Sequence, residues 1–337
     1  MKVSTWQGCY DGNWNGLIVP EAFSHPAKFA PGLIRRIYQH CLEQGYVRKG
    51  ETIVDPFGGI GAGGIMAAYA GLSWIGVELE TKFVTLAIEN FEMHKYPCSR
   101  MGYPQPAIIQ GDSRRLSQVL QEADLIATSP PFVDCLHQTE GGMLTPHQRA
   151  DHGRNENAAS VLARDYGTTP GQIGGMKAGD VGAVVTSPPY EGTELQGGPT
   201  KDGQGYTGGK RCFNEYGITD GQIGAEKSES YWQAVADVYR ECWKILKPGG
   251  VIVVVLKSYI KQGRRVPLPM QTLKLLIHLG FEPLERIKAM LVKETVTAGL
   301  FGDVRKVKER KSFFRRLAES KGSPAIDWEE ALICRKP

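Results

Sequence analysis

The chain has 337 residues, of which 41% are hydrophobic and 23% charged, with 40 Lys and Arg against 36 Asp and Glu. This composition suits one large domain with a sizeable core and excludes collagen, a coiled coil and wholesale disorder. Seven dispersed cysteines without a CxxC pair argue against a disulfide framework and a zinc site, so we expect no metal. No apolar run suits a membrane span and the first residues lack a signal-peptide layout, so we expect a cytoplasmic protein without a membrane partner.

Apolar runs alternate with helical patterns along most of the chain. The predicted strands lie at 52–55, 73–78, 107–112, 124–128, 251–256 and 286–293. The predicted helices lie at 63–70, 81–94, 114–121, 230–246 and 270–279. Strands that alternate with helices form βαβ units, so we expect an α/β fold with a doubly wound, mostly parallel sheet.

Residues 133–227 differ from their flanks, because they hold 19 of the 41 glycines and show no long apolar periodicity. We expect a mostly irregular, Gly-rich insertion here, which divides the chain into 1–132, 133–227 and 228–337. A loop of that length inside a compact domain usually has a function. The region also contains a repeat, since AVVTSPPY at 183–190 echoes IATSPPF at 126–132.

Acidic residues end three consecutive predicted strands, at Asp55, Glu78 and Asp112. The first is followed by a glycine-rich turn, DPFGGIG at 55–61, in which the backbone can approach a ligand closely. An acid at the end of the second strand, about 20 residues further on, suits the hydroxyls of a ribose. These residues predict an adenosine pocket, but they do not distinguish NAD from S-adenosylmethionine.

The repeated Ser-Pro-Pro-aromatic segment decides between these cofactors. Two prolines directly after a buried strand stop the strand and hold a rigid turn. A serine hydroxyl and the first proline carbonyl can accept the two hydrogens of an exocyclic amine, while the aromatic ring stacks on the base. The amine lone pair is then localised for attack on a methyl sulfonium. The candidate catalytic residues are Ser129, Pro130, Pro131 and Phe132 in one copy and Ser187, Pro188, Pro189 and Tyr190 in the other.

Together these segments resemble the S-adenosylmethionine-dependent amino-methyltransferases of DNA, the N4-cytosine and N6-adenine enzymes. The resemblance covers roughly 23–132 and 183–293, in the order of members that are not circularly permuted. It implies a Rossmann-like class I methyltransferase fold with S-adenosylmethionine as cofactor and no metal. The cofactor contacts that it implies are His25, Pro26, Lys28, Phe29, Asp55, Pro56, Phe57, Gly58, Gly59, Gly61, Glu78, Asp112 and Ser113.

The resemblance also implies a function for each part of the chain. Residues 1–132 become the cofactor-binding half, 133–227 a candidate target-recognition region, and 228–337 the second half with a basic C-terminal arm. The partner is double-stranded DNA in the cytoplasm of a prokaryote or a phage-infected cell, with a restriction endonuclease as a further candidate partner. A serine as the first residue of the tetrapeptide favours the N4 amine of cytosine over the N6 amine of adenine as the group that is methylated. RNA base methylation and a non-catalytic DNA-binding module remain alternatives.

Only one of the two tetrapeptides can follow the fourth strand of the sheet. Ser129 lies 17 residues after Asp112, which fits one helix and one strand. The copy that begins at Ser187 ends in a tyrosine, and the helix predicted at 230–246 follows it along the chain. The spacing therefore favours Ser129 slightly, and both copies stay candidates.

Two basic clusters are candidates for phosphate contacts. The larger places seven cations in twelve residues, with Glu309 as its one acid. A polyanionic substrate favours a phosphate-binding arm over a solvated helix face. The candidate nucleic-acid contacts are Lys257, Lys261, Arg264, Arg265, Arg305, Lys306, Lys308, Arg310, Lys311, Arg315 and Arg316.

Overall fold

The computed structural model describes residues 1–25, 28–120, 179–189, 223, 228–261, 264–299, 302–309, 322 and 324–337. The strands are β1 (Lys2–Trp6), β2 (Thr52–Asp55), β3 (Ser73–Glu78), β4 (Ala107–Gln110), β5 (Val181–Thr186), β6 (Leu246–Leu256), β7 (Tyr259–Lys261), β8 (Arg264–Val266), β9 (Glu282–Met290), β10 (Val292–Gly299), β11 (Gly302–Glu309) and β12 (Trp328–Arg335). The α-helices are α1 (Pro31–Glu43), α2 (Ala62–Tyr69), α3 (Thr81–Met101), α7 (Ser228–Ile245) and α8 (Leu268–His278). Short 3₁₀ turns lie at Pro20–Ser24 and Ser113–Arg115.

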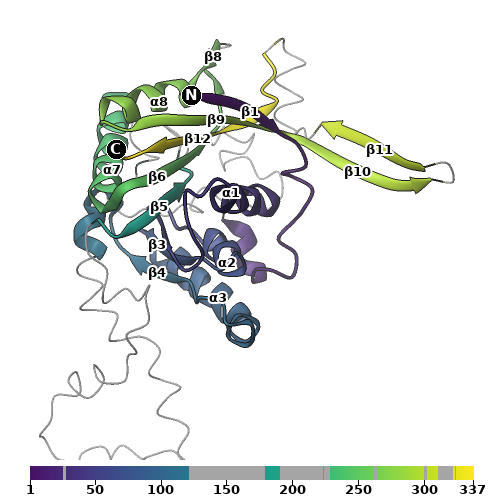
Figure 1. Ribbon diagram of the computed structural model, residues 1–337, viewed down its shortest axis with the longest axis horizontal. Helices are drawn as coiled ribbons and strands as arrows, with labels where there is room; N and C mark the ends of the chain where they lie inside the picture. The colour runs from purple at the N-terminus through teal and green to yellow at the C-terminus, as the bar shows by residue number, and fades with distance from the viewer. Residues whose placement is uncertain are drawn as a thin grey trace, which may run out of the picture.

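An eight-stranded sheet forms the centre of the molecule, in the order β1-β9-β12-β6-β5-β2-β3-β4 (Figure 1). All neighbouring strands pair in parallel except β12, which is antiparallel to both β6 and β9. Strands β2 to β6 therefore end on the same side of the sheet, which we call the carboxyl edge. This arrangement confirms the predicted α/β, Rossmann-like, mostly parallel fold.

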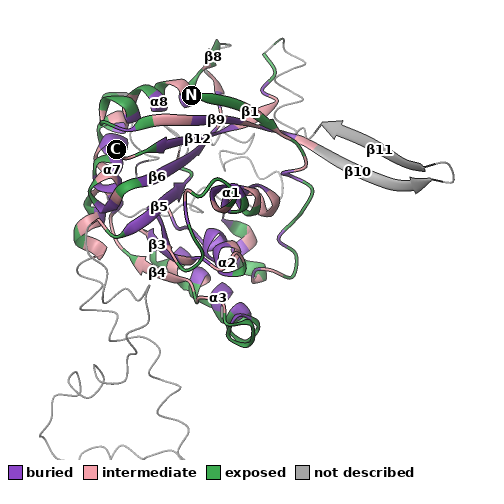
Figure 2. Cartoon of the chain, viewed as in Figure 1, coloured by how far each residue is buried: buried purple, intermediate pink, exposed green. Residues whose placement is uncertain are grey.

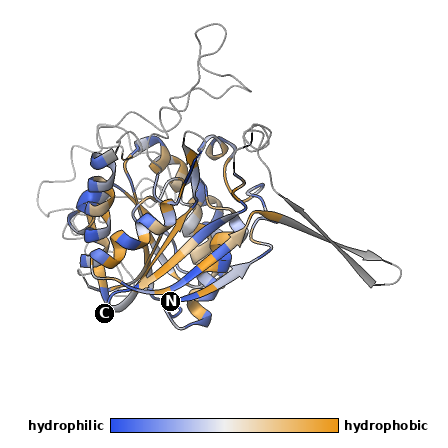
Figure 3. Cartoon of the chain, turned by 90° about the horizontal axis from the view of Figure 1, so that it is seen from above, coloured by the Kyte–Doolittle hydropathy of each residue, from blue (hydrophilic) through white to orange (hydrophobic). Residues whose placement is uncertain are grey.

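Helices cover both faces of the sheet and divide the core into two layers. Helices α1, α2 and α3 pack on one face with Trp74 and Val253, whereas α7 and α8 pack on the other with Ile75 and Val254. Every residue of β2 and of β5 is buried, as Figure 2 shows, because central parallel strands are covered on both sides. Apolar strands between amphipathic helices are visible in Figure 3.

The acid-terminated strands follow their predictions closely. Strands β2 and β3 have the predicted bounds, and β4 begins at the predicted residue. Helix α3 continues beyond its predicted end at His94 to Met101, with Pro97 inside it. The residues of β1, α1 and β12 fall in none of the predicted elements.

The range expected to form a mostly irregular insertion, 133–227, contributes a central strand to the sheet. Strand β5 lies inside the range 133–227, yet it pairs with β2 on one side and β6 on the other. The run expected as the fourth strand, 124–128, lies outside the described residues. Since β3 and β5 take both sides of β2, the fourth-strand position belongs to Val181–Thr186.

Candidate active site

A pocket of about 410 Å³ opens at the carboxyl edge of the sheet, close to the ends of β2, β3, β4 and β5. Ligands of doubly wound sheets bind at this edge. Residues from the whole length of the chain line the pocket: His25, Lys28, Phe29, Asp55, Pro56, Phe57, Gly58, Gly59, Ile60, Ala62, Gly63, Val77, Glu78, Leu79, Phe83, Gly111, Asp112, Ser113, Ser187, Pro188, Pro189, Ile223, Val255 and Glu329.

The glycine-rich turn after β2 forms the floor of the pocket. Gly59 has a positive φ of 53°, and its added Cβ would lie 3.2 Å from Nε2 of His25. Gly58 packs against β3 so closely that a Cβ would lie 3.0 Å from the Cα of Gly76. The turn therefore needs glycine both for its backbone conformation and for its close approach to neighbouring strands.

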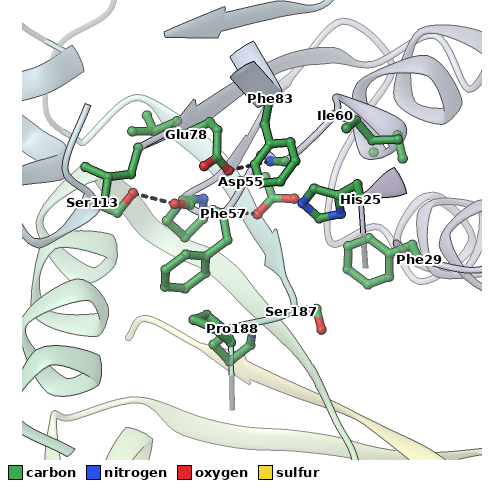
Figure 4. A pocket seen from close by; sticks show the side chains of 18 of the residues that line it. His25, Phe29, Asp55, Phe57, Ile60, Glu78, Phe83, Ser113, Ser187 and Pro188 are labelled. Atoms are coloured by element: carbon green, nitrogen blue, oxygen red, sulfur yellow. Dashed lines mark hydrogen bonds between the residues drawn. The ribbon is translucent and has the colours of Figure 1, made fainter. Parts of the chain in front are cut away.

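Glu78 is held in place by the same turn (Figure 4). Its Oε2 accepts a hydrogen bond of 2.9 Å from the backbone N–H of Gly59, and its Oε1 accepts one of 3.0 Å from that of Glu80. Each carboxylate oxygen has two lone pairs, so both keep an acceptor site for a ligand hydroxyl. The carboxylate is thus oriented before any ligand arrives.

The three strand-end acids that line the pocket have different environments. Burial raises the pKa of Asp55 to about 7, although a 3.0 Å hydrogen bond from the Phe57 N–H opposes the shift. Burial also raises the pKa of Glu78. Burial acts in the same direction on Asp112, but hydrogen bonds from Arg114 outweigh it and lower the pKa of Asp112. A ligand that brings positive charge close to Asp55 would favour the ionised form of its carboxyl group.

Residues that follow Pro20–Ser24 line the pocket beside α3. The His25 ring packs edge-on against Phe83, with ring centroids 4.3 Å apart. Lys28 donates a 3.1 Å hydrogen bond to the Phe23 carbonyl, and Phe29 receives one of 2.8 Å from the indole of Trp14. His25, Lys28 and Phe29, three of the predicted cofactor contacts, line the pocket, whereas Pro26 lies outside the described residues.

Strand β5 leads directly into the second tetrapeptide. Ser187 is exposed and Pro188 buried, and both lie across the pocket from Glu78 in Figure 4. The hydroxyl of Tyr231 on α7 donates a 3.0 Å hydrogen bond to the carbonyl of Pro189. Tyr190 lies outside the described residues, as do Ser129, Pro130, Pro131 and Phe132. The spacing favoured Ser129 as the serine that follows the fourth strand. This preference is wrong, because β5, which Ser187 follows, occupies the fourth-strand position beside β2.

Most of the predicted cofactor contacts lie together in this pocket. Pro56 and Ser113 are joined by a hydrogen bond from the serine hydroxyl to the proline carbonyl. Gly61 does not line the pocket; its added Cβ would meet the Phe91 ring at 2.4 Å, so this glycine is required for packing.

The sequence did not single out several residues that shape the site. Phe83, Ile223 and Glu329 line the pocket, and Tyr231 holds the tetrapeptide. Asn90 ties the floor to the N-terminal segment, since its amide donates to Ile60 and accepts from the N–H of Val19. Phe83 and Asn90 share a face of the predicted helix 81–94, and this shared face was the one sequence signal that could have identified them. The remaining residues reach the site only through tertiary contacts.

The predicted phosphate contacts lie away from the floor of the pocket. Lys257 directly follows β6, Lys261 belongs to β7, and Arg264 and Arg265 are exposed on β8. Arg305, Lys306 and Lys308 belong to β11 of the β10–β11 hairpin, not to a helix. Arg310, Lys311, Arg315 and Arg316 lie outside the described residues.

Two further properties belong to the part of the chain that the structure describes. Its His, Cys, Asp and Glu side chains include no group of three or more placed to hold a metal ion. No helix in the same residues combines the length and apolarity that a membrane span requires.

Comparison with known proteins adds a family match to this geometry. The family model described as DNA methylase matches residues 4–89, which carry the N-terminal segment, the glycine-rich turn and Glu78. The match supports an amino-methyltransferase interpretation of this part of the chain. No curated protein matches the sequence.

Many solved structures are similar in fold at low sequence identity. A methyltransferase from Methanosarcina mazei that depends on S-adenosylmethionine has 10% identity and a TM-score of 0.38, with 88% of this chain and 96% of that chain covered. One from Agrobacterium tumefaciens has 13% identity and a TM-score of 0.38, covering 92% and 63%. Precorrin 8W decarboxylase from Methanobacterium thermoautotrophicum has 11% identity and a TM-score of 0.39, covering 92% and 93%.

Proposed function

We propose that this protein transfers a methyl group from S-adenosylmethionine to the exocyclic N4 amine of a flipped cytosine in double-stranded DNA. One observation carries the proposal: Ser187 and Pro188, at the end of β5, line the same pocket as Asp55 and Glu78. In this proposal, an amine-binding turn and an adenosine-binding wall share a single cavity. The match of residues 4–89 to the DNA methylase model supports the same class of reaction.

The pocket has the properties that S-adenosylmethionine requires. Its volume of about 410 Å³ falls in the range of small-molecule sites. Glu78 would hold the ribose hydroxyls, Asp112 and Ser113 would lie beside the adenine, and Asp55 would face the positively charged methionine portion. When bound, this cofactor supplies a methyl group on a sulfonium, which is a strong electrophile.

The residues of the tetrapeptide act on the target amine. We assign the Ser187 hydroxyl and the Pro188 carbonyl as acceptors for the two amine hydrogens. These hydrogen bonds draw the amine nitrogen out of conjugation with the ring and localise its lone pair toward the methyl donor. The amine loses its surplus proton after attack, so a strong general base is not required. Because the amine takes part in a base pair, the base must leave the duplex first.

Serine as the first residue of the tetrapeptide supports cytosine as the target base. The alternative is N6-adenine methylation in the same pocket, which uses the same acceptors. Methylation of an RNA base and a non-catalytic role are the remaining alternatives.

The decisive experiment incubates the protein with labelled S-adenosylmethionine and either duplex DNA or RNA, followed by mass spectrometry of the nucleosides. We expect label in N4-methylcytosine from DNA. Label in N6-methyladenine would correct the target base, and label in RNA alone would correct the polymer. Cofactor binding without any labelled nucleoside would contradict an enzymatic function.

A further inference from the structure

Glu329 is an acidic residue of the pocket to which the proposed function assigns no part. The ionisable residues among the described ones that line the pocket are His25, Lys28, Asp55, Glu78, Asp112 and Glu329. All except Glu329 are predicted cofactor contacts and lie in the first 112 residues, whereas Glu329 belongs to β12, near the C-terminus. A carboxylate from the far end of the chain therefore reaches the same cavity.

The strand order places Glu329 on the substrate side of the pocket. Strands β2 and β3 and the turn after β4 carry the acids assigned to the cofactor, and β5 leads into the tetrapeptide. Strand β6 follows β5 in the sheet and β12 follows β6, so the tetrapeptide strand lies between Glu329 and the cofactor strands. Glu329 therefore borders the part of the pocket that we assign to the flipped base.

Glu329 and Ser187 also lie on the same face of the sheet. Val185, Val255 and Ala331 pack in the core layer beneath α1, α2 and α3. Alternate residues of a strand share a face, and Ser187 follows Val185 by two residues as Glu329 precedes Ala331 by two. Only β6 separates the two strands, so their backbones lie two strand spacings apart, about 10 Å. Both side chains thus line one part of the pocket, with Val255 of β6 between them.

Tyr10 holds the carboxylate of Glu329 in place. The Tyr10 hydroxyl donates a 2.7 Å hydrogen bond to Oε2 of Glu329, and Tyr10 itself is buried in the same core layer. In the part of the chain that the structure describes, no Lys, Arg or His side chain forms an ion pair with this carboxylate. Oε1 is therefore the oxygen that can take a proton from a ligand.

The proposed reaction moves a positive charge onto the base. The amine nitrogen forms a bond to the methyl carbon as the bond from that carbon to sulfur breaks, and the electron pair of the broken bond stays on sulfur. The nitrogen then carries the methyl group, two hydrogens and the positive charge that the sulfonium has lost. A carboxylate on the base side of the tetrapeptide stabilises this charge where it develops. One proton must leave the nitrogen before the product is neutral.

We propose that Glu329, positioned by Tyr10, takes up the proton that the amine releases. The inference rests on the proposed function and deepens it, since it assigns a proton acceptor to that reaction. The proton passes from the amine nitrogen to Oε1, directly or through one water molecule, which is the reach of a general base. Glu329 is partly exposed, so the proton can then pass to solvent and restore the carboxylate.

The test is the Glu329→Gln variant, which keeps the size of the side chain but cannot take up a proton. In single turnovers with saturating cofactor and duplex, methyl transfer should slow by about 10²-fold, the lower end of the range for general bases, because water remains as a weaker acceptor. Affinity for S-adenosylhomocysteine should keep its wild-type value. Affinity for duplex DNA should not fall, because the variant removes a negative charge that repels a polyanion. This combination separates a part in the chemistry from damage to the fold.

A second variant tests whether the missing group acts as a proton acceptor. Glu329→Ala leaves a space that a small carboxylate can enter. Added formate should restore part of the rate of this variant, whereas chloride at the same ionic strength should not. Tyr10→Phe should lower the wild-type rate by about threefold to tenfold, the worth of one hydrogen bond, because the carboxylate loses its orientation.

A matched control makes the same charge change at the other edge of the sheet. Glu282 is the first residue of β9, at the end of that strand away from the carboxyl edge. Its carboxylate is exposed and accepts a 2.6 Å hydrogen bond from the guanidinium of Arg335. Glu282→Gln should keep the wild-type rate and both wild-type affinities.

The possible results separate this inference from the function beneath it. A wild-type rate in Glu329→Gln, or equal effects of formate and chloride on Glu329→Ala, would overturn the inference while methylation of DNA by the wild type still stood. Weaker cofactor binding in Glu329→Gln would overturn it as well, since the carboxylate would then belong to the cofactor site. A wild type that methylates no nucleoside would overturn both proposals.

Discussion

The two walls of the pocket are built in different ways. The wall formed by β2, β3 and the turn after β4 is fixed by its own hydrogen bonds, from Gly59 to Glu78, from Phe57 to Asp55 and from Ser113 to Pro56. The tetrapeptide wall is anchored to α7 by the hydroxyl of Tyr231, and its serine is exposed. We call the first the fixed wall and the second the open wall. A fixed wall suits a cofactor that every reaction uses, and an open wall suits a large substrate that must enter and leave.

The largest expected effect is on the open wall. Ser187→Ala should lower the rate of methyl transfer by about 10²–10³-fold, because it removes an acceptor that acts on the developing charge of the amine. Affinity for S-adenosylmethionine should stay near the wild-type value, since this serine is assigned to the base. Single-turnover kinetics with calorimetry of cofactor binding measures both.

The matched variant for that measurement is Ser129→Ala, in the other copy of the tetrapeptide. A much smaller loss is expected there. A dominant loss at Ser129 instead would contradict the assignment to β5, and equal losses in two folded variants would indicate that both turns build one site.

The next effect concerns the buried acid of the fixed wall. The pKa of Asp55 in the folded protein is about 7, against about 3.9 for an unfolded aspartate. The folded protein therefore holds a proton that the unfolded chain releases, and its stability falls as pH rises from about 4 to about 7. The Asp55→Asn variant should not lose stability over this pH range. At pH 8 its free energy of unfolding should exceed that of the wild type by up to about 4 kcal/mol.

Denaturant unfolding of both proteins between pH 4 and pH 8 checks this, with the difference between them as the measured quantity. The same substitution should weaken binding of S-adenosylmethionine, because the cation loses its carboxylate. Equal pH dependence of stability in wild type and variant would show that Asp55 keeps an ordinary pKa.

A smaller effect is expected for Glu78, the acid that we assign to the ribose hydroxyls. Glu78→Gln should weaken cofactor binding by about 1–3 kcal/mol, since the amide cannot accept at both oxygens and strands a backbone donor or a ligand hydroxyl. The maximal rate with saturating cofactor should change less than the dissociation constant does. A change confined to the maximal rate would place Glu78 on the substrate side.

The smallest effect tests the anchor of the open wall. Tyr231→Phe should lower kcat by about threefold to tenfold, the worth of one hydrogen bond, with cofactor affinity unchanged. Tyr239→Phe is the control: this tyrosine is also buried on α7, but its hydroxyl has no hydrogen-bond partner among the described residues. Equal kcat in the two variants would show that the Pro189 carbonyl needs no anchor.

The fixed wall was also the easier one to predict from sequence. An apolar run that ends in an acid and a glycine turn is a local pattern, so β2 and β3 have the predicted bounds. The position of the open wall depends on chain length between strands, which physical chemistry constrains only weakly: lengthening a loop costs little closure entropy. Spacing therefore favoured Ser129, whereas β5 and Ser187 come much later in the chain.

Strands defined by their neighbours were missed for a related reason. The sequence of β12, WEEALICR, contains two adjacent acids and becomes a strand between β6 and β9. The same pairing lengthens β6 beyond its predicted start, since Gly249 donates to the carbonyl of Lys336 and Lys336 donates to that of Gly250. Neither pattern is visible in a local window.

The position of β12 has a consequence for how the molecule is made. Strands β9 and β1 reach the rest of the sheet only through β12, which follows every other strand of that sheet in sequence. During translation, the sheet therefore cannot be completed until β12 has left the ribosome. Before that point its strands form two separate pieces with exposed edges. A nonsense codon or proteolytic cut shortly before Trp328 would therefore remove more than one strand: it would separate β1 and β9 from the other five strands and leave both pieces prone to aggregation.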